Sequence, residues 1–154
     1  MWIAKRTDYA TRAVLALALA PGNAPVKLQT ICERTHIPTS VLEQVMLQLR
    51  NNGVVRSERG PEGGYRLNKA PEEITLEDIV RMFQGPLAPI SCATRKNPEP
   101  CLMTIGCSMR DVWEEVRDAT IRILERTTFA DLAERAHSPW RTHLEVTAQR
   151  RPSA

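Results

Sequence analysis

The sequence predicts a mainly α fold with a small β-hairpin wing, in which a winged helix-turn-helix is followed by a long C-terminal helix. Three observations predict it: helical apolar periodicity broken by short turns over 7–52, two extended runs around a glycine-rich tip at 54–67, and a helix with coiled-coil spacing after a long irregular loop. The 154 residues suffice for one compact domain with an appendage. We divide the chain into a winged-helix unit, a cysteine-containing loop, a segment with two C-terminal helices and a polar tail, at 1–85, 86–107, 108–137 and 138–154.

The first three predicted helices are bounded by residues that start or stop helices. The first spans about 7–20, with Thr7 as its N-cap and a Pro-Gly pair after its end. The second spans about 27–35, and after a tight turn at 36–38 the third runs over 39–52. The third helix repeats apolar residues at helical spacing, and we expect this stripe to be buried: Leu42, Val45, Met46 and Leu49.

A hairpin and a fourth helix follow. Two short extended runs within 54–67 flank a glycine-rich tip, which is typical of a β-hairpin. The fourth helix ends before Gly85, and its start carries a strong signal. Thr75 is the expected N-cap, and Asp78 stands three residues on, where it closes a capping box.

The rest of the chain predicts a long loop and two more helices. Residues 87–106 show no period, and a loop of this length inside a compact chain is usually functional or disordered. Ser108 is the expected N-cap of a long helix, with Asp111 in the capping-box position, and a short helix at 129–136 follows. The long helix carries apolar residues at spacings of four, three and four, which is typical of a pairing seam: Val112, Val116, Ala119 and Ile123.

Composition limits the location and the partners of the chain. The net charge of +3 permits nucleic-acid binding without demanding it. The apolar stretch at 13–20 is too short for a membrane span and follows charged residues. We therefore expect a cytoplasmic protein without a membrane partner, in a compartment that keeps thiols reduced. Its four cysteines are then ligands, reactive thiols or core residues rather than disulfides.

The third helix carries polar side chains at the end that would enter a DNA groove. In a helix-turn-helix the N-terminal end of the second helix reaches base edges, so this end needs polar residues. Gln44 can pair with adenine, Glu43 can accept a hydrogen bond from cytosine, and Ser40 can serve either. Thr39 completes this set. The alternative is an ordinary solvated face of a helical domain.

The hairpin supplies the wing of such a domain. Arginines on it would contact phosphates or enter the minor groove, and its glycines would let the backbone approach DNA closely. The residues that we assign to this surface are Arg56, Arg59, Gly63, Gly64 and Tyr65, with Arg66 as a further cation.

Three strings in one register carry a family resemblance. VLEQ at 41–44, LRNNGVV at 49–55 and SERGPEGGYRL at 57–67 resemble the signature of the Rrf family of winged-helix transcription regulators, the IscR, NsrR and RirA type. The other segments fall in the family's order, so the resemblance covers nearly the whole chain. It implies that the long helix pairs two protomers and that the homodimer reads a palindromic operator in double-stranded DNA.

The loop contains three cysteines, Cys92, Cys101 and Cys107, with eight and five residues between them. Thiolates bind iron well, and an irregular loop lets three of them converge. The family's cluster-binding members resemble this arrangement, which implies an iron-sulfur cluster of the 2Fe–2S or 4Fe–4S type. Their usual first spacing is five, so the eight here puts the cluster type in doubt. A zinc site and a thiol-disulfide switch are the alternatives, although the close cysteine pair of structural zinc sites is absent.

The resemblance also bears on a fourth ligand. Some members use a histidine three residues after the third cysteine, but Arg110 stands there and stays protonated. Other members use an acidic residue near the start of the first helix, donated by the partner protomer, and Asp8 stands in that place. Asp8 is equally explained as a carboxylate that a helix N-terminus stabilises. Cys32 lies on the apolar stripe of the second helix and is expected to be a core residue.

Together these observations predict a dimeric bacterial DNA-binding transcription regulator, a repressor, that senses iron, redox state or nitric oxide through an iron-sulfur cluster. One alternative is a winged-helix regulator without a cluster, based on thiols or zinc. Another is a scaffold that uses the winged helix for protein contacts. A metal- or thiol-dependent enzyme is disfavoured, because the sequence lacks a phosphate-binding loop, a nucleophile elbow and a His-Glu metal pair.

Overall fold

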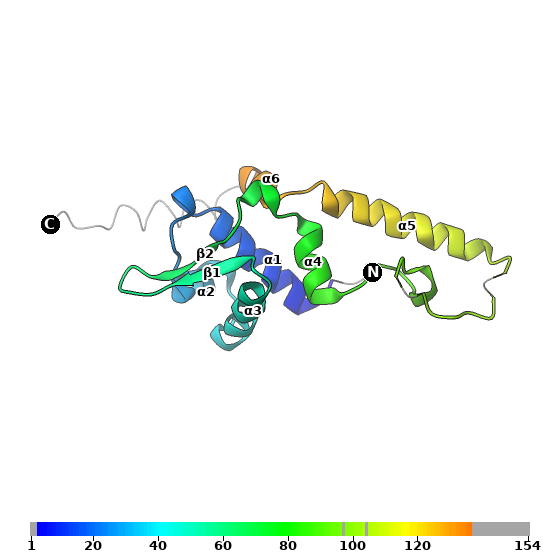
Figure 1. Ribbon diagram of the computed structural model, residues 1–154, viewed down its shortest axis with the longest axis horizontal. Helices are drawn as coiled ribbons and strands as arrows, with labels where there is room; N and C mark the ends of the chain where they lie inside the picture. The colour runs from blue at the N-terminus through cyan, green and yellow to red at the C-terminus, as the bar shows by residue number, and fades with distance from the viewer. Residues whose placement is uncertain (1–2, 97, 104, 137–154) are drawn as a thin grey trace.

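The computed structural model describes residues 3–96, 98–103 and 105–136. These residues form six helices and one hairpin, as the sequence predicts for a winged helix-turn-helix with a long C-terminal helix, and Figure 1 shows their arrangement. Three short 3-10 turns lie at Pro21–Asn23, Pro71–Glu73 and Ser91–Ala93. The regular elements are α1 (Lys5–Ala18), α2 (Leu28–Thr35), α3 (Thr39–Asn51), β1 (Val55–Glu58), β2 (Gly64–Leu67), α4 (Leu76–Gln84), α5 (Ser108–Glu125) and α6 (Phe129–Arg135).

Residues 3–84 together with α6 form the part of the molecule that we call the body. Helix α1 lies at its centre and contacts α2, α3, α4 and α6. The body contains a single large apolar cluster, because α1 and α3 present their apolar stripes to the same interior. The side chains of this cluster that are fully buried include Val14, Leu17, Ile31, Leu42, Met46, Leu49, Ile79 and Phe129.

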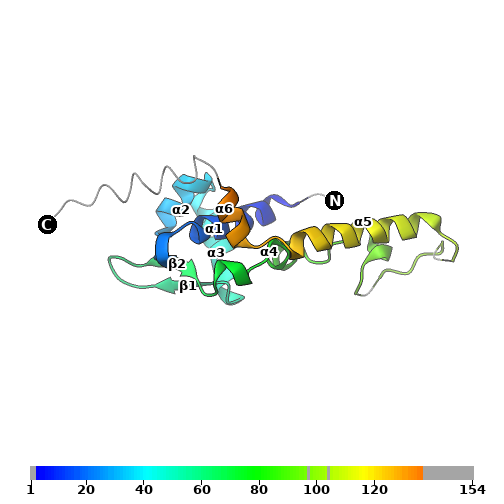
Figure 2. The same ribbon diagram turned by 90° about the horizontal axis from the view of Figure 1, so that it is seen from above.

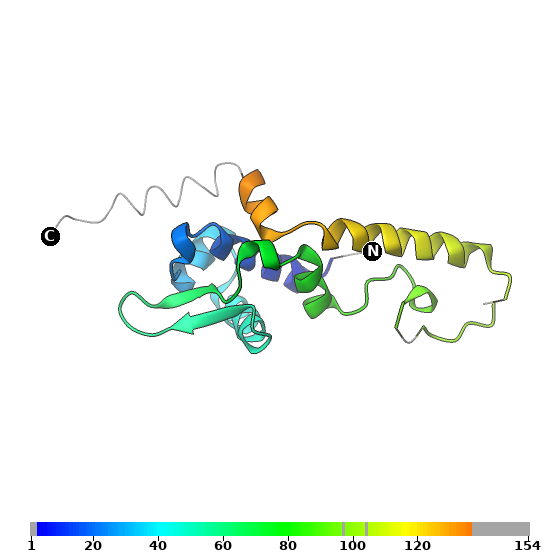
Figure 3. The same cartoon turned by 45° about the horizontal axis from the view of Figure 1, so that its top comes forward.

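The loop at 85–107 and α5 form the part that we call the arm. Both project away from the body, the loop running out and α5 running back (Figures 2 and 3). The chain then re-enters the body through α6, whose Phe129 is fully buried. The Phe129 amide donates to the Ile74 carbonyl at 2.9 Å, and the Leu76 amide donates to the Thr127 carbonyl at 2.8 Å. These bonds fix the C-terminal end of the arm, where α5 leads into α6, to the start of α4 on the body.

Of three N-cap residues predicted from the sequence, one is confirmed and two are wrong. The capping box of Thr75 and Asp78 is confirmed, since the Asp78 amide donates to the Thr75 hydroxyl at 3.1 Å. Thr7 as the N-cap of α1 is wrong: Ala4 occupies that position, and Thr7 is fully buried inside the helix. Ser108 as the N-cap of α5 is also wrong, because Cys107 occupies that position and Ser108 is already helical. The predicted polar tail at 138–154 lies outside the described residues.

In the described part of the chain, no helix combines the length and the apolar character that crossing a bilayer requires.

Candidate nucleic-acid interface and cysteine loop

Helices α2 and α3 are joined by a tight turn at 36–38. His36 takes a left-handed conformation with φ 53° and ends α2, while its amide donates to the Cys32 carbonyl at 2.8 Å. Ile37 is buried, and Pro38 takes the N-cap position of α3. The Cys32 thiol lies 3.6 Å from the Thr39 hydroxyl, so it connects the two helices. This turn sets the direction of α3.

Helix α3 buries one face and exposes the other. Its apolar stripe is buried as predicted, and the residues assigned to base reading are all exposed: Thr39, Ser40, Glu43 and Gln44. Leu47 lies one turn further along the same face and is also exposed, 41% of its surface being accessible. Leu47 is not among the DNA-contacting residues predicted from the sequence, although its spacing from Ser40 and Glu43 indicates the same face. An apolar side chain there suits a thymine methyl group.

The wing is a two-stranded antiparallel ladder in which Val55 pairs with Leu67 and Glu58 pairs with Gly64. A third segment joins it: the amide of Val26 donates to the carbonyl of Tyr65 at 2.8 Å, and the amide of Tyr65 donates back at 2.9 Å. The side chain of Asn23 holds the other end, bonding both backbone groups of Leu67. The wing is thus attached to the body at its base by a third segment that the sequence pattern did not predict.

Two wing glycines have roles inside the domain. A Cβ on Gly63 would lie 2.3 Å from the Glu58 carbonyl oxygen, and a Cβ on Gly64 would lie 2.5 Å from that of Val26. Both contacts are with backbone, which cannot rotate away. The two glycines therefore allow the turn and the three-segment ladder to form, whatever they contribute toward DNA.

The wing presents a cluster of charge. Arg56 and Arg66 stand directly opposite each other on β1 and β2, and Glu58 lies between them. Arg66 pairs with Glu58 at 2.7 Å, whereas Arg56 lies 3.9 Å from it. Arg59 is exposed in the turn that follows β1. The exposed cations Arg56 and Arg59 are the wing's available partners for phosphate.

The three loop cysteines occupy different places. Cys92 lies in the 3-10 turn at Ser91–Ala93 and is half-buried, and Cys107 is half-buried at the start of α5. Cys101 is exposed between them. Among the described residues, no three His, Cys, Asp or Glu side chains converge as a metal site would require. The donor set still fits an iron-sulfur cluster chemically, since three thiols lie on one irregular loop.

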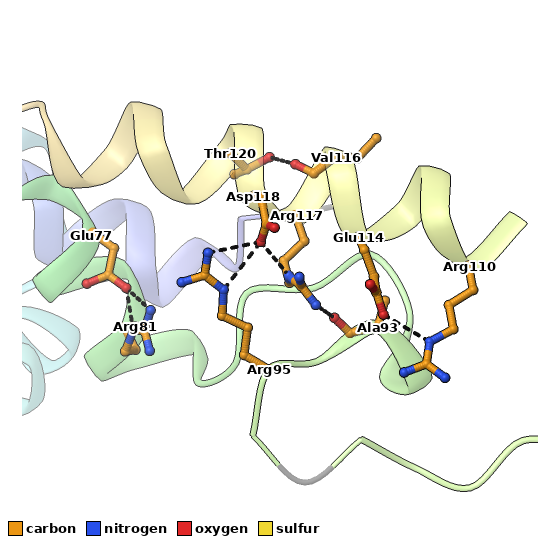
Figure 4. Close-up of polar contacts among 10 residues, drawn as sticks. All are labelled: Glu77, Arg81, Ala93, Arg95, Arg110, Glu114, Val116, Arg117, Asp118 and Thr120. Carbon is orange, nitrogen blue, oxygen red and sulfur yellow. Dashed lines mark hydrogen bonds and ion pairs between the residues drawn. The ribbon is translucent and has the colours of Figure 1, made fainter. Parts of the chain in front are cut away.

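Arg110 lies in the first turn of α5, three residues after Cys107, and pairs with Glu114 of the same helix (Figure 4). It bonds Glu114 at 2.9 Å, and this bond is the main reason why the pKa of Arg110 is raised above its usual value. A smaller electrostatic contribution from Cys92 also raises the pKa of Arg110, so these two side chains lie near each other.

Asp8 lies in the first turn of α1, and its carboxylate is paired with Arg12 at 2.8 Å. Both side chains are partly exposed. Within one chain the carboxylate is therefore satisfied by a neighbour on its own helix.

A group of polar contacts holds the Cys92 turn against α5 (Figure 4). Arg117 is 9% exposed and donates to the Ala93 carbonyl and, at 2.7 Å, to Asp118. Asp118 also accepts from Arg95 at 3.1 Å. The pKa of Asp118 is held below its usual value, chiefly by the hydrogen bond from Arg117 and then by that from Arg95. The sequence did not indicate that an arginine would be buried here.

The outer face of α5 is apolar and uncovered in the single chain. Arg117 and Ile121 are the residues of α5 that are buried, and they face the body and the loop. The predicted seam lies on the opposite face, with Val112, Val116 and Ile123 55%, 41% and 53% exposed. Soluble monomers rarely expose such a continuous stripe, so this face suits a second helix.

The fold, the polar face of α3 and the charged wing define a winged-helix DNA-binding protein of the transcription-regulator class. Residues 3–135 match the model of the Rrf2 family, described as an iron-dependent transcriptional regulator. The chain belongs to the Rrf2 family of DNA-binding transcriptional regulators.

Its relatives and structural neighbours are regulators rather than enzymes. The chain is 34% identical over 133 residues to the HTH-type transcriptional regulator CymR of Bacillus subtilis, covering 86% of this chain and 90% of CymR. It is 30% identical to the regulator NsrR of Shouchella clausii, covering 86% and 88%. The solved structure of CymR, titled the global cysteine regulator of B. subtilis, matches with a TM-score of 0.77 at 32% identity, covering 89% of this chain and 99% of that one. T. potens IscR matches with a TM-score of 0.72 at 30% identity, covering 89% of each chain.

Proposed function

We propose that this chain is a homodimeric, cytoplasmic repressor that reads a palindromic operator and senses iron, redox state or nitric oxide through an iron-sulfur cluster. Cys92, Cys101 and Cys107 are the proposed ligands. The observation that carries the proposal is the position of all three thiols on the one loop that connects the DNA-binding body to α5. The donor chemistry and the iron-dependent description of the family support it.

The arm would couple such a cysteine site to the DNA-binding body. The loop leaves the end of α4, and the backbone of the Cys92 turn is bonded to Arg117 of α5. A change in the ligation of the cysteines would therefore shift α4 and α5 together. A bound cluster would supply charge and ligation that change when it is oxidised, nitrosylated or lost. A coupling of roughly 1–3 kcal/mol would change operator affinity about 5- to 150-fold.

The test is the iron and sulfide content of protein purified without oxygen. We expect a brown protein, and Cys92→Ala, Cys101→Ala and Cys107→Ala should each abolish the colour. Cys32→Ala is the matched control, since Cys32 lies in the body against Thr39 and should leave the colour intact. A colourless wild type, or a coloured Cys101→Ala protein beside a bleached Cys32→Ala protein, would contradict the ligand assignment.

Asp8 of the partner protomer is the proposed fourth ligand. Its carboxylate would have to leave Arg12, with which it pairs on an exposed surface, and such exposed pairs contribute only about 0–1 kcal/mol. Asp8→Ala should alter the visible spectrum of the coloured protein without lowering its iron content. An unchanged spectrum would show that Asp8 is not a ligand, and its carboxylate would then only interact with the N-terminus of α1.

The DNA roles divide between helix and wing. We assign base reading to Thr39, Ser40, Glu43 and Gln44, because they are exposed at the entering end of α3. We assign phosphate or minor-groove contact to Arg56 and Arg59, with Gly63, Gly64 and Tyr65 shaping the wing that carries them.

A regulator without a cluster is the second candidate. The similarity to CymR, whose structure is titled a cysteine regulator, favours it, as do three cysteines that do not converge among the described residues. This candidate expects iron-free, colourless protein whose operator binding responds to thiol oxidation or to zinc. The iron measurement above separates the two.

A further inference from the structure

A half-open cavity of about 210 Å³ lies between α4, the first part of the loop and α5. Its walls include the apolar side chains of Leu87 and Ile121, both buried. Pockets for drug-sized ligands measure roughly 300–1,000 Å³, so this one suits a ligand of metabolite size.

The cavity is strongly cationic. It is lined by four positive side chains from α4, the loop and α5: Arg81, Arg95, Lys96 and Arg117. Their ion-pair partners within the described residues are two carboxylates, Glu77 for Arg81 and Asp118 for the two other arginines. Four positive charges against two negative ones leave an excess of two. Neither carboxylate belongs to the cavity lining, so the excess faces the cavity.

Two hydrogen bonds preorganise the guanidinium of Arg117 (Figure 4). Its bonds to Asp118 and to the Ala93 carbonyl hold the guanidinium in place at 9% exposure, so little rotamer entropy remains to be lost on binding. A planar guanidinium matches the two oxygens of a carboxylate, and charge pairs strengthen where water is excluded.

We propose that this cavity binds a small organic carboxylate. Its apolar body lies against Leu87 and Ile121, and its carboxylate lies against Arg117, Arg95 and Lys96. Because α4 belongs to the body and the other cations belong to the arm, such a ligand ties the arm to the body and holds the turn that carries Cys92. The site is separate from the cysteine ligands and does not require iron.

The test is calorimetric titration of the full, iron-free chain with butanoate, with the neutral analogue butanamide and with inorganic phosphate. We expect saturable binding of butanoate, binding of phosphate at least tenfold weaker, and none of butanamide. Affinity for butanoate should fall as salt rises. Equal binding of butanamide and butanoate, phosphate binding as tight as butanoate, or no saturable binding of butanoate would each overturn the proposal.

Paired variants localise the site. Arg95→Gln with Lys96→Gln should weaken butanoate at least tenfold, while the thermal unfolding midpoint falls only slightly, because both side chains are exposed and exposed ion pairs such as Arg95–Asp118 contribute little to stability. Arg122→Gln with Arg126→Gln is the matched control, since it removes the same two positive charges from exposed positions at the end of α5, outside the cavity. An equal loss of affinity in the control, or none in the double variant, would overturn the assignment. Since the protein carries no iron here, failure of the cluster proposal leaves this result unaffected.

Discussion

The body and the arm hold their side chains in place by different means. The body buries a continuous apolar cluster that α1, α3, α4 and α6 share. The arm has only a small cluster, in which Leu87 and Ile121 meet Val80 of α4. It leaves Leu102 and Ile105 of the loop fully exposed and relies on polar contacts around Arg117.

The body is therefore stabilised by burial of its own apolar side chains, whereas the arm leaves apolar side chains exposed that a partner would have to cover. Burial contributes roughly 25 cal/mol per Å² of apolar surface, and most of that surface lies in the body. Segments with few buried apolar contacts open at low free-energy cost, and switching elements come from such segments. The arm therefore suits sensing and pairing, and the body suits DNA reading.

The largest expected effect comes from breaking the apolar face of the arm. Val116→Asp with Ile123→Asp places two charges in the proposed seam, where burial of an unpaired charge is costly. We expect monomers by light scattering and loss of specific operator binding, with the helical spectrum of the body retained. Arg122→Asp, exposed beside the seam, should remain dimeric. A dimeric double variant would show that the protomers pair elsewhere.

Two glycine substitutions sharpen the contrast between the two parts. In the body, Gly64→Ala drives a Cβ into the Val26 carbonyl and should cost about 1–3 kcal/mol of unfolding free energy, as overpacking does. In the arm, Gly106 has φ +80° but open space around it, so Gly106→Ala should cost less in global unfolding. Urea unfolding measures both, and Ser57→Ala on the exposed side of β1 is the control. Equal losses of unfolding free energy in Gly64→Ala and Gly106→Ala would contradict the conclusion that the body is closely packed and the arm is not.

Within the body, helix and wing should affect DNA binding differently. Glu43→Ala should relax discrimination at one base position by roughly 1–3 kcal/mol if Glu43 accepts a bond from cytosine. Arg59→Ala should weaken binding to all sequences and reduce the salt slope by about 1, as loss of one phosphate contact does.

The measurement is a titration of both variants against single-base operator changes at several salt concentrations. Unchanged base preference for Glu43→Ala together with an unchanged salt slope for Arg59→Ala would remove this division of roles. A rise in non-specific binding for Glu43→Ala would instead mean that Glu43 acts by repelling phosphate.

The smallest expected effect concerns the capping box that docks α6 on the body. The Thr128 amide and hydroxyl both bond Asp131, and the backbone bond is the main reason why the pKa of Asp131 lies below its ordinary value of 3.8. A lowered folded pKa stabilises the protein above the unfolded value, and that stability is lost as the pH falls below about 4. Asp131→Asn should flatten the pH dependence of urea unfolding in this range.

One further variant and a control test this cap. Thr128→Ala should cost about 1 kcal/mol at neutral pH, since it removes the hydroxyl that the Asp131 amide bonds. Asp111→Asn, on an exposed position of the arm, serves as the control and should leave the acid dependence as it is. If the free energy of unfolding falls equally with decreasing pH in wild type and Asp131→Asn, groups other than Asp131 cause the acid sensitivity.

Local signals predicted the elements of the body well, because those signals depend on neighbouring residues. The capping box of Thr75 and Asp78 starts α4 as expected, and α3 ends within one residue of the prediction. Thr7 failed as a cap for a tertiary reason. The Ala4 amide donates to the side chain of Gln84 at 3.1 Å, so α1 starts earlier and places Thr7 in the core.

The sequence by itself determined the order of the elements, the exposed face of α3, the seam of α5 and the presence of three thiols on one loop, since each is a matter of spacing along the chain. Tertiary structure alone decided the third segment of the wing, the docking of α6, the burial of Arg117 and the cationic cavity. Each of these joins residues far apart in sequence, as Val26 joins Tyr65 and Arg117 joins Ala93. Periodicity describes which face of an element is apolar but not which distant element meets it, and so these features appear only in the folded chain.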